Sequence, residues 1–566
     1  MRGMRVAFIT VCTTMFGSDC VYAQQRSWSE YFSRSRDWGA GAPNPNTCGD
    51  APSLNQVVAF DAALARREPA ANCLHRYNWK PSDYVIGRMK ANRELGNGAT
   101  FNFCNADLSN LDLRGVKIER SDLRSVDLSG SNLTASTLSE SDLHGADLTN
   151  TILDASGMSN VNASRANFDG TSLRHAYVSN SLFYQSSFNK ANLSAGNFDN
   201  SVFDLSKFSE VNFRQASIIA AKLDNVTVHN TDFSKAKMQL SSLKGSVIRY
   251  SDFSGALLSG VHFVSTDLSR SKFSKTDLAE AKLDFACLYN SDFSSANLQQ
   301  SSLFYASINM TDLTDARLLF SDLTGALYAP LSAPPSPVVA GIRGIESAVF
   351  PPGREIGLVQ LRDLIQKAGL RDLERAATYA IESGRTSYAL TAHRYSNGGF
   401  ENLEEKLNAY FRYIFFDITS GYGLYPGRSL WIILVIWVSL APVYYIPIRF
   451  GLNKPRVHAG VYKIIPTDKV IQGVMHKAKP NGVVEVVLLK ETGIAAAARA
   501  LQFSLFSAFH IGWRDFNVGS WLSRIQSEEY TLKGTGWVRT LSGIQSLVSV
   551  YLLSVWILSY FGRPFQ

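Results

Sequence analysis

The sequence predicts a β solenoid joined to an α-helical membrane domain, and three observations carry that prediction. Residues 101–328 repeat every five residues without a break. Two later runs, 429–448 and 540–561, contain no charged residue and are long enough to cross a bilayer. A Pro-rich stretch and a helical region separate the repeat from the first of these runs. We therefore expect two structural classes within one chain of 566 residues.

The repeat places a large apolar residue at every fifth position from Phe103 to Tyr328, which gives 46 positions in one frame. A small residue stands two places before most of them, and Asp or Asn often lies between, as in ADLTN at 146–150. A period of five fits neither an α-helix nor a flat strand. It fits a chain that turns a corner every five residues and points its large apolar side chain inward. One unit cannot bury its own apolar face, so the units must stack as a solenoid.

By these residues the stretch resembles the pentapeptide repeat family, and the resemblance covers 228 of the 566 residues. It implies an all-β, right-handed quadrilateral β-helix with four units per coil. We therefore expect about 11 coils and a length of roughly 55 Å, at about 4.8 Å per stacked strand. One expected coil has Phe at all four inward positions, which we interpret as core packing: Phe198, Phe203, Phe208 and Phe213.

The charge is distributed unevenly along the chain. The whole chain carries a net charge of +8, whereas the repeat holds 24 Asp or Glu and 19 Lys or Arg, a net of −5. The basic excess therefore gives no reason to expect nucleic-acid binding by the rod. The resemblance also allows a DNA-mimic role, which would need a cytoplasmic and more acidic rod. The sequence contains no P-loop, no GxSxG or HExxH motif and no paired Cys/His ligands, so we expect no enzyme activity, cofactor or metal.

The first residues predict a secretory signal peptide over 1–23. Arg2 and Arg5 precede an apolar core at 6–16, and cleavage is expected after Ala23. The alternative is an uncleaved membrane anchor.

Residues 24–100 are expected to cap the first coil, because a solenoid end exposes strand edges and apolar side chains. Cys48 and Cys73 lie in this region, and Cys104 follows in the first coil. In an oxidising compartment two of these three could pair, and the sequence leaves open which two. Two helices are expected in this region, near 53–67 and 82–94.

The Pro-rich stretch 329–345 should stop the stacking and act as a linker. Residues 346–428 are expected to be helical up to the membrane domain. Within them, 402–418 is amphipathic, with an apolar face of Leu403, Leu407, Tyr410, Phe411, Ile414 and Phe415. Such a helix before a membrane span either lies at the membrane interface or packs onto its own domain, and both alternatives stay open.

The membrane domain is expected over 429–566. Pro442 and Pro447 should kink the far end of the first span. Between the spans, 451–490 alternates Val or Ile with polar residues and contains the turn Asn481-Gly482. That pattern predicts a small β element.

The segment 494–519 contains an apolar stretch that is too short to span, which favours a re-entrant or interfacial helix. Span, short helix, loop and span is the plan of two-span potassium channels, and ALQFSLFSAF is similar to their pore helix. The six places of their filter, TVGYGD, would be taken by His510, Ile511, Gly512, Trp513, Arg514 and Asp515.

Arg514 stands where that filter has its second Gly, whose backbone most other residues adopt only at a cost. Four guanidinium groups near one axis would also repel cations. The resemblance therefore implies a degenerate filter that is not selective for potassium. The alternative is that Arg514 pairs with Asp515 or binds lipid headgroups.

Residues 449–539 carry 13 Lys or Arg against 6 Asp or Glu, and a basic loop between two spans prefers the cytoplasm. Together with the signal peptide, this predicts a bacterial inner-membrane protein whose repeat domain lies in the periplasm. Two functions remain open. One is a channel-like homo-oligomer, a tetramer, with the β-helix as sensor or assembly domain. The other is a non-conducting tethered rod with a structural role or a periplasmic protein partner.

Overall fold

The structure is a computed structural model that describes residues 80–83, 85–87, 101–334, 340–351, 353–391, 401–450, 453–454, 457–458, 460–465, 485–508 and 531–561. The chain divides into two compact units, Met1–Ala380 and Ile381–Gln566. The predicted signal peptide, the helix near 53–67, Cys48 and Cys73 lie outside the described residues. Of the helix expected near 82–94, the described part is helical at Asp83 and at 85–87.

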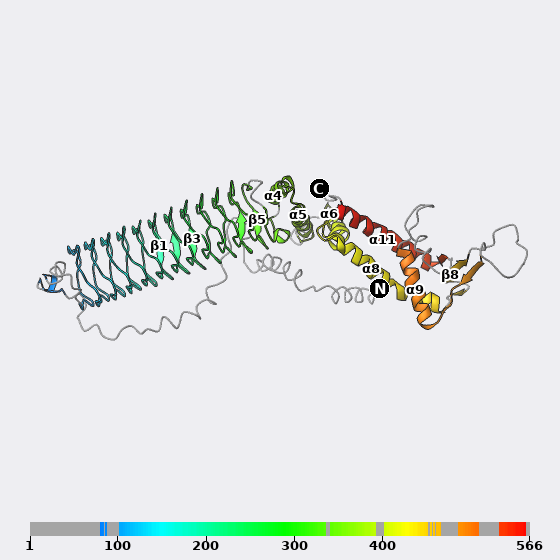
Figure 1. Cartoon of the computed structure of the whole chain (residues 1–566), viewed down its shortest axis with the longest axis horizontal. Helices are drawn as coiled ribbons and strands as arrows, with labels where there is room; N and C mark the ends of the chain where they lie inside the picture. Colours follow the sequence, from blue (N-terminus) through cyan, green and yellow to red (C-terminus); the bar gives the residue numbers. More distant parts are fainter. Residues whose placement is uncertain are drawn as a thin grey trace, which may run out of the picture. The chain divides into compact units, whose positions relative to one another are not determined.

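The first unit contains a β-helix whose coils form one stack (Figure 1). Parallel bridges join residues twenty apart, beginning with Asn102 and Asp122. Four five-residue units therefore complete one coil, which confirms the predicted four-sided solenoid. Where three residues of a side pair fully, they form β1 (Lys207–Ser209), β2 (Thr227–His229), β3 (Val247–Arg249), β4 (Ser307–Asn309) and β5 (Leu327–Ala329). The strands β1, β2 and β3 pair in parallel, with Phe208 opposite Val228 and Val228 opposite Ile248.

Each corner of a coil depends on a residue in the left-handed region of backbone conformation. From Asn105 to Phe320, the non-glycine corner residues have φ between 51° and 60°. The corner is closed by a backbone hydrogen bond, as from Ala106 N to Phe103 O at 2.9 Å. The frequent Asn and Gly at this position follow from their tolerance of positive φ.

The Asp or Asn of the repeat also has a local role. Its side chain accepts a hydrogen bond from the backbone two residues further on, as from Ser109 N to Asp107 Oδ1 at 3.1 Å. This bond fixes the turn in the manner of an Asx turn. The preference for Asp or Asn before the inward residue is thereby explained.

The inward side chains form a continuous apolar core. The expected all-Phe coil is buried at each of its four positions, which confirms its interpretation as core packing. A column of rings also runs along one side, with neighbouring centroids 4.6–4.9 Å apart. Its members are Phe213, Phe233, Phe253, Phe273 and Phe293. Near-parallel stacking of this kind adds to the energy of apolar burial.

Buried hydroxyl groups occupy many of the small positions of the repeat. Many of them donate a hydrogen bond to a carbonyl 23 residues earlier, as from Ser131 Oγ to Leu108 O at 2.6 Å and from Ser201 Oγ to Val178 O at 2.8 Å. A buried hydroxyl that is hydrogen-bonded in this way costs little to desolvate. The coils are therefore joined by side chains as well as by backbone.

The prediction that the stretch 329–345 is a linker beyond the repeat is wrong. Bridges join Asp312 to Ser332, Asp322 to Arg343 and Leu327 to Val349, so a further coil includes Pro-rich residues and continues beyond them. The spacing of the paired residues grows from 20 to 21 and then 22, so two additional residues are accommodated in this coil. Three apolar side chains of this coil are buried: Ile342, Ile345 and Ala348.

Two helices follow the last coil. After the short η5 (Ile345–Ser347), α4 (Ile356–Lys367) contacts β5, and a Cβ at Gly357 would lie 2.8 Å from Pro330 Cδ. The face of α4 that carries Leu358, Leu361 and Ile365 is buried. This helix covers apolar surface at the end of the solenoid. The boundary between the two units falls within α5 (Arg371–Thr391).

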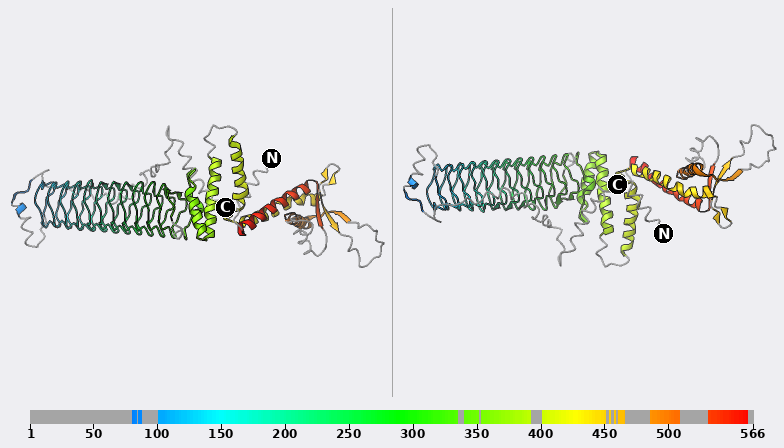
Figure 2. Two further views of the ribbon diagram at one scale, coloured as in Figure 1. Left: turned by 90° about the horizontal axis from the view of Figure 1, so that it is seen from above. Right: turned by 90° about the horizontal axis from the view of Figure 1, so that it is seen from below.

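The second unit is helical, with a small sheet. Its helices are α6 (Glu401–Arg412), the π-helical η7 (Tyr413–Asp417), α7 (Ile418–Ser420), α8 (Gly427–Phe450), α9 (Gly493–Ala508) and α11 (Trp537–Phe561). Its strands are β6 (Asn453–Lys454), β7 (Val457–His458), β8 (Gly460–Ile465), β9 (Glu485–Leu488) and β10 (Thr531–Thr535). The helices α8 and α11 contact each other and lie side by side in both views of Figure 2.

The sheet of the second unit has the order β10–β8–β9 and is antiparallel. The β element predicted within 451–490 corresponds to β8 and β9. The sequence did not predict β10, which comes from the residues directly before α11 and pairs with β8. The predicted turn at Asn481-Gly482 lies outside the described residues.

Candidate functional site at the contact of three apolar helices

The helices α8 and α11 are long and apolar enough to cross a membrane, by length and composition. They contain 24 and 25 residues, which corresponds to about 36 Å of rise each, against a bilayer core of about 30 Å. The helix α8 continues through Pro442 and Pro447, where a kink was expected. Both helices include the whole of the corresponding uncharged runs.

Most of the surface of these two helices is exposed. Only 22% of the most apolar window in each helix is buried, whereas a core helix of a soluble protein is mostly buried. The exposed side chains include Trp431, Leu434, Val438, Leu547, Ile557 and Leu558. An apolar surface of this extent is typical of contact with lipid or with another protein.

The shorter helix α9 lies against both of them and brings together a buried polar network. Tyr444 Oη of α8 donates a hydrogen bond to Gln545 Oε1 of α11 at 2.9 Å. Gln545 Nε2 in turn donates to the carbonyl and to the hydroxyl oxygen of Ser504 on α9, each at 3.0 Å. Ser504 Oγ donates to Trp437 O of α8 at 2.8 Å. Three helices are thus joined through one amide side chain that is 2% exposed.

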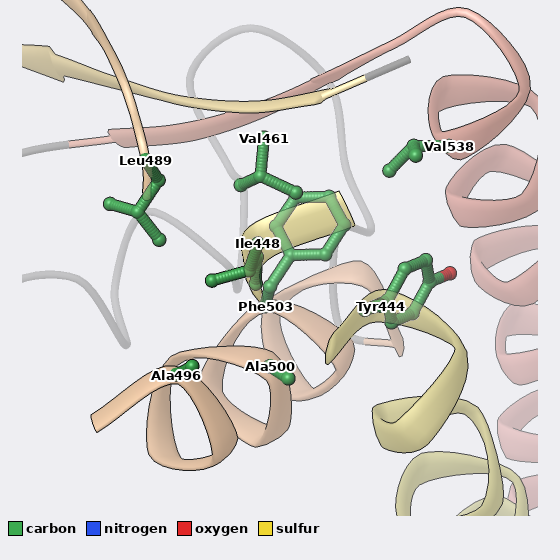
Figure 3. Packing of buried hydrophobic residues seen from close by; sticks show 8 residues of the cluster. All are labelled: Tyr444, Ile448, Val461, Leu489, Ala496, Ala500, Phe503 and Val538. Atoms are coloured by element: carbon green, nitrogen blue, oxygen red, sulfur yellow. The ribbon is translucent and has the colours of Figure 1, made fainter. Parts of the chain in front are cut away.

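An apolar cluster continues this contact toward the sheet. Tyr444 and Phe503 meet edge to face, with ring centroids 4.9 Å apart. Figure 3 shows the Phe503 side chain between residues of α8 and the sheet, with Val461 of β8 above it. The buried members are Tyr444, Ile448, Val461, Leu489, Ala496, Ala500, Phe503 and Val538. The sheet therefore packs onto the same end of the three-helix contact.

The helix α9 covers only part of the length of its neighbours. Its hydrogen bonds and buried contacts on α8 extend from Trp437 to Ile448, and those on α11 from Val538 to Gln545. A span of twelve residues on α8 corresponds to about 18 Å of rise. Since the whole of α8 is twice that length, α9 extends along half of it.

The helix α6 and its π-helical continuation η7 carry the predicted amphipathic face, and that face is exposed. Leu407 is 60% exposed, and Tyr410, Phe411 and Ile414 are each at least half exposed. This segment contacts α11 at Tyr551, whose hydroxyl donates to Phe415 O and whose ring meets that of Phe415 edge to face, with centroids 5.4 Å apart. The prediction for 402–418 left two alternatives open, and most of the apolar face does not pack onto described residues of its own unit.

A small polar cavity lies between α5 and α6. Its volume is about 200 Å³, and its lining is Arg385, Thr386, Ala389, Asn408, Ala409 and Arg412. Glu382 pairs with both guanidinium groups, at 2.9 Å from Arg385 and 3.8 Å from Arg412. Burial raises the pKa of Tyr422 to about 12, and its hydrogen bond with Thr386 acts in the opposite direction. Two guanidinium groups face one carboxylate here, so these three groups leave a net positive charge beside the cavity.

The predicted pore-like residues His510, Ile511, Gly512, Trp513, Arg514 and Asp515 lie outside the described residues, because the description stops at the end of α9. Their interpretation stays a prediction. Within the described residues, no group of three or more His, Cys, Asp or Glu side chains is placed to hold a metal ion.

Sequence reasoning missed the network centred on Gln545. The signal was present, because Gln545 is the only side-chain amide in the uncharged run 540–561. An amide in such a run needs partners, and it can find them only on a neighbouring helix.

Two cysteines of the β-helix, Cys104 and Cys287, are disulfide-bonded. A pairing that involves Cys104 was among the expected ones, whereas a bond at Cys287 was not predicted.

The comparisons with known proteins concern the β-helix. The family model described as "Pentapeptide repeats" matches in eight copies at residues 118–154, 186–225, 229–263 and 262–300. These residues therefore carry pentapeptide repeats, in agreement with the predicted resemblance. No curated protein matches the chain.

Solved structures of pentapeptide repeat proteins are similar to part of this chain. HetL from the cyanobacterium Nostoc sp. strain PCC 7120, involved in heterocyst differentiation regulation, is 24% identical over 43% of this chain and 95% of its own, with a TM-score of 0.21. A thylakoid-lumen protein of Arabidopsis thaliana is 27% identical over 16% of this chain and 61% of its own, with a TM-score of 0.15. QnrB1, a plasmid-mediated fluoroquinolone resistance protein, is 14% identical over 41% and 96%, with a TM-score of 0.19.

Proposed function

We propose that this pentapeptide repeat protein is anchored in a membrane by α8 and α11, and that α9 enters the same bilayer as a half-length, channel-like helix. The membrane is the bacterial inner membrane, and the β-helix is a periplasmic sensor or assembly domain. In this proposal, four chains assemble so that their α9 helices and the residues from His510 to Asp515 meet near one axis.

The observation that carries the proposal is the place of α9. It is too short to cross a bilayer, yet it is bonded to both candidate spans through Ser504 and Gln545. Backbone that ends within a membrane is tolerated where it is buried in protein or lines water. A half-length helix between two spans, followed by a loop, is the arrangement that the sequence resemblance to two-span channels implies.

The exposed face of α6 supports the membrane part of the proposal. Leu407, Tyr410 and Phe411 of this helix are at least half exposed, and only the short η7 and α7 separate it from α8. Amphipathic helices at this place in a chain bury such a face in the headgroup region.

The disulfides support the orientation. Disulfides persist in oxidising compartments such as the periplasm and are rare in the cytoplasm. Two bonded cysteines in the β-helix therefore favour its placement outside the cytoplasm. The basic charge of residues 449–539 independently favours a cytoplasmic loop between the spans.

The proposal is tested with purified full-length protein in detergent and in planar bilayers. We expect a discrete tetrameric mass and reproducible single-channel steps that Arg514→Ala alters in size or ion preference. The matched control is Arg499→Ala, which removes the same charge in the middle of α9, where Arg499 pairs with Glu491 at 3.4 Å. This control should leave the current unchanged. A monodisperse monomer without steps would overturn the channel proposal.

A second function has its own support. The buried Gln545 and the partly buried Ser542 of α11 bond within the chain, and apolar residues of the same helix such as Leu547 are exposed. This arrangement also suits two spans that only tether a structural or protein-binding rod. Membrane fractionation with a monomeric mass, no conductance and a cross-linked periplasmic partner would establish the tethered rod instead.

A further inference from the structure

Each side of the β-helix presents one row of outward-facing residues, which are twenty apart and joined by parallel bridges. We call the row from Asn102 to Asp322 the first side and the row from Lys117 to Arg317 the fourth side. The turns at 119–120, at 139–140 and so on to 319–320 form the corner between them, which we call the fourth corner. Because the coil has four sides, the first and fourth sides meet at right angles.

Four-sided rods of this kind can form a closed ring. When one side of each rod contacts the adjacent side of the next rod, the contact is heterologous, and the right angle between the two sides closes the ring after four copies. The corner between the two contacting sides then points at the ring axis. A ring of four is also the assembly that the proposed function requires.

The charges of the first and fourth sides are complementary at equal height. In a ring of rods at one height, each residue of the fourth side lies opposite the residue five later on the neighbouring first side, with an offset of about 1.2 Å. Asp122 also pairs with Arg124 of its own chain at 2.6 Å, so the pairs near the C-terminal end of the rod carry the most weight. Three opposed pairs have unlike charges and none has like charges: Lys117 with Asp122, Asp277 with Lys282, and Arg317 with Asp322.

The same surface exposes apolar side chains. Tyr177 of the fourth side is 55% exposed and would face Leu182 of the neighbouring first side, which is 38% exposed. On the fourth corner, Leu240 is 71% exposed and Phe320 is 48% exposed. From residue 219 onward this corner has twelve residues, of which only Glu280 is charged. A corner with so little charge suits the axis of a ring, where four copies of each residue meet.

A second pair of sides has unlike charges but an unsuitable corner. We call the row from Asp112 to Ser332 the third side, and on it Lys272 would face Asp277 of a neighbouring fourth side. A ring through the third and fourth sides would place the corner between them on the axis. Four copies of each basic residue would repel one another there. That corner carries five basic residues against Asp154 and Asp315: Arg114, Arg174, Arg214, Lys235 and Lys275.

We propose that the β-helices of four chains pack side by side in a ring. The fourth side of each rod contacts the first side of the next, and the fourth corner lies at the axis. This inference rests on the four-fold assembly of the proposed function and assigns the assembly surface to two sides of the β-helix. It does not depend on whether α9 lines a pore.

Photo-cross-linking of the full-length protein in membranes tests the contact. Benzoylphenylalanine in place of Leu257, on the fourth side, should cross-link to the peptide that contains His262 of another copy and give bands up to the tetramer. The matched control is the same replacement at Val247, which lies in the same coil on the second side and would face outward. The native side chains are 39% exposed at Leu257 and 38% at Val247. The control should stay monomeric on the gel.

The outcomes separate this inference from the proposed function. A tetrameric mass in detergent without cross-links from position 257 would overturn the ring of rods and leave the proposed function standing. A monomeric mass without cross-links would overturn both. Equal cross-linking from positions 257 and 247 would show unspecific contact between rods and would also refute the ring.

Charge reversal tests which two sides meet. Lys282→Asp places a like charge opposite Asp277 and should lower the yield of cross-links about threefold, the size of effect expected for an exposed charged contact. Adding Asp277→Lys in the same chain should restore most of the yield. The matched control Lys272→Asp makes the same reversal on the third side and should leave the yield unchanged. Hydrogen exchange of the coils serves to show that the variants remain folded. A loss in Lys272→Asp with none in Lys282→Asp would refute the proposed ring in favour of one through the third and fourth sides.

Discussion

The β-helix and the three-helix contact are built with opposite polarity. In the β-helix, apolar side chains face inward, and Asp, Asn, Ser and Lys cover the outside. In the contact of α8, α9 and α11, an amide and several hydroxyl groups are buried, while large side chains such as Leu547 and Trp431 face outward. The outer surface of the β-helix is therefore mostly polar, whereas the outer surface of the helical contact is mostly apolar.

The difference teaches how each region obtains its stability. The β-helix gains from removing Phe and Leu side chains from water, and its backbone bonds repeat from coil to coil. In the helical contact, little apolar surface is gained between helices, so hydrogen bonds through Gln545 and close packing must select the arrangement. Four substitutions test this contrast, in order of decreasing expected effect.

The largest effect is expected from Phe233→Ala in the ring column. Its ring lies between Phe213 and Phe253, at 4.9 and 4.7 Å, and truncation would leave a cavity that rigid coils cannot close. We expect the local free energy of unfolding to fall by about 3–5 kcal/mol. Hydrogen exchange of amides in the neighbouring coils measures it. The control Leu240→Ala removes a side chain that is 71% exposed, and a change above about 0.5 kcal/mol there would contradict the contrast.

The second-largest effect is expected in the contact of α8, α9 and α11, where a buried polar side chain is replaced by an apolar one. Gln545→Leu leaves the Tyr444 hydroxyl without its acceptor and Ser504 without its donor. Stranded polar groups should cost about 1–3 kcal/mol of unfolding free energy, measured by denaturation of the full chain in mixed micelles. The neighbouring Ile544→Leu, on the exposed side of α11, should be neutral. A Gln545→Leu protein as stable as the original would mean that packing alone holds the three helices.

A smaller effect is expected where polar groups are buried inside the β-helix. Ser201→Ala removes the bond to Val178 O and should cost about 1 kcal/mol, measured by hydrogen exchange of the adjacent coils. Ser156 provides a matched control, since its hydroxyl has no hydrogen-bond partner among the described residues. Ser156→Ala should therefore be neutral or slightly stabilising. Equal losses in both variants would show that the hydroxyl bonds between coils contribute nothing specific.

The smallest effect concerns the pH dependence of the β-helix. Burial, followed by Lys282 and Lys244, lowers the pKa of His262 below its usual 6.5, and Asp224 and Asp284 act weakly in the opposite direction. The folded state then binds fewer protons than the unfolded state. Stability should be constant above pH 6.5 and fall as the pH drops below that value.

Two variants check the cause of this pH dependence by denaturation at pH 5 and pH 8. His262→Gln should remove the fraction of the acid-induced loss that belongs to this side chain. Lys282→Met should reduce it without removing it, because burial and Lys244 remain. A loss that is the same in all three proteins would assign it to carboxylates elsewhere on the rod.

The sequence was most informative where structure repeats at short range. From one apolar residue in every five, the sequence predicted the corners and the inward-facing core. The family resemblance added the prediction of a twenty-residue coil, which the bridges confirm. The rule could not predict that Arg343 and Val349 continue the stacking, because two additional residues shift the five-residue frame while the bridges to the preceding coil are kept.

The candidate site was less accessible to prediction. The helices were evident from uncharged runs, whereas the partners of Gln545 depend on how three helices meet. The strand β10 likewise forms because it pairs with β8, although its own residues show no clear alternation of apolar and polar side chains. Residues His510 to Asp515 lie outside the described residues, and their pore-like interpretation stays a prediction.

Because one coil takes twenty residues, removing or adding residues rotates all later positions about the axis of the β-helix. Loss of one five-residue unit would shorten the array by about 1.2 Å and turn every later residue by a quarter of a coil. Cys287 would then leave the side that it shares with Asp107. Loss of a complete coil would preserve every later side and remove about 4.8 Å. Insertions and deletions in this array should therefore be tolerated in steps of twenty residues, since only such steps keep distant surface features in phase.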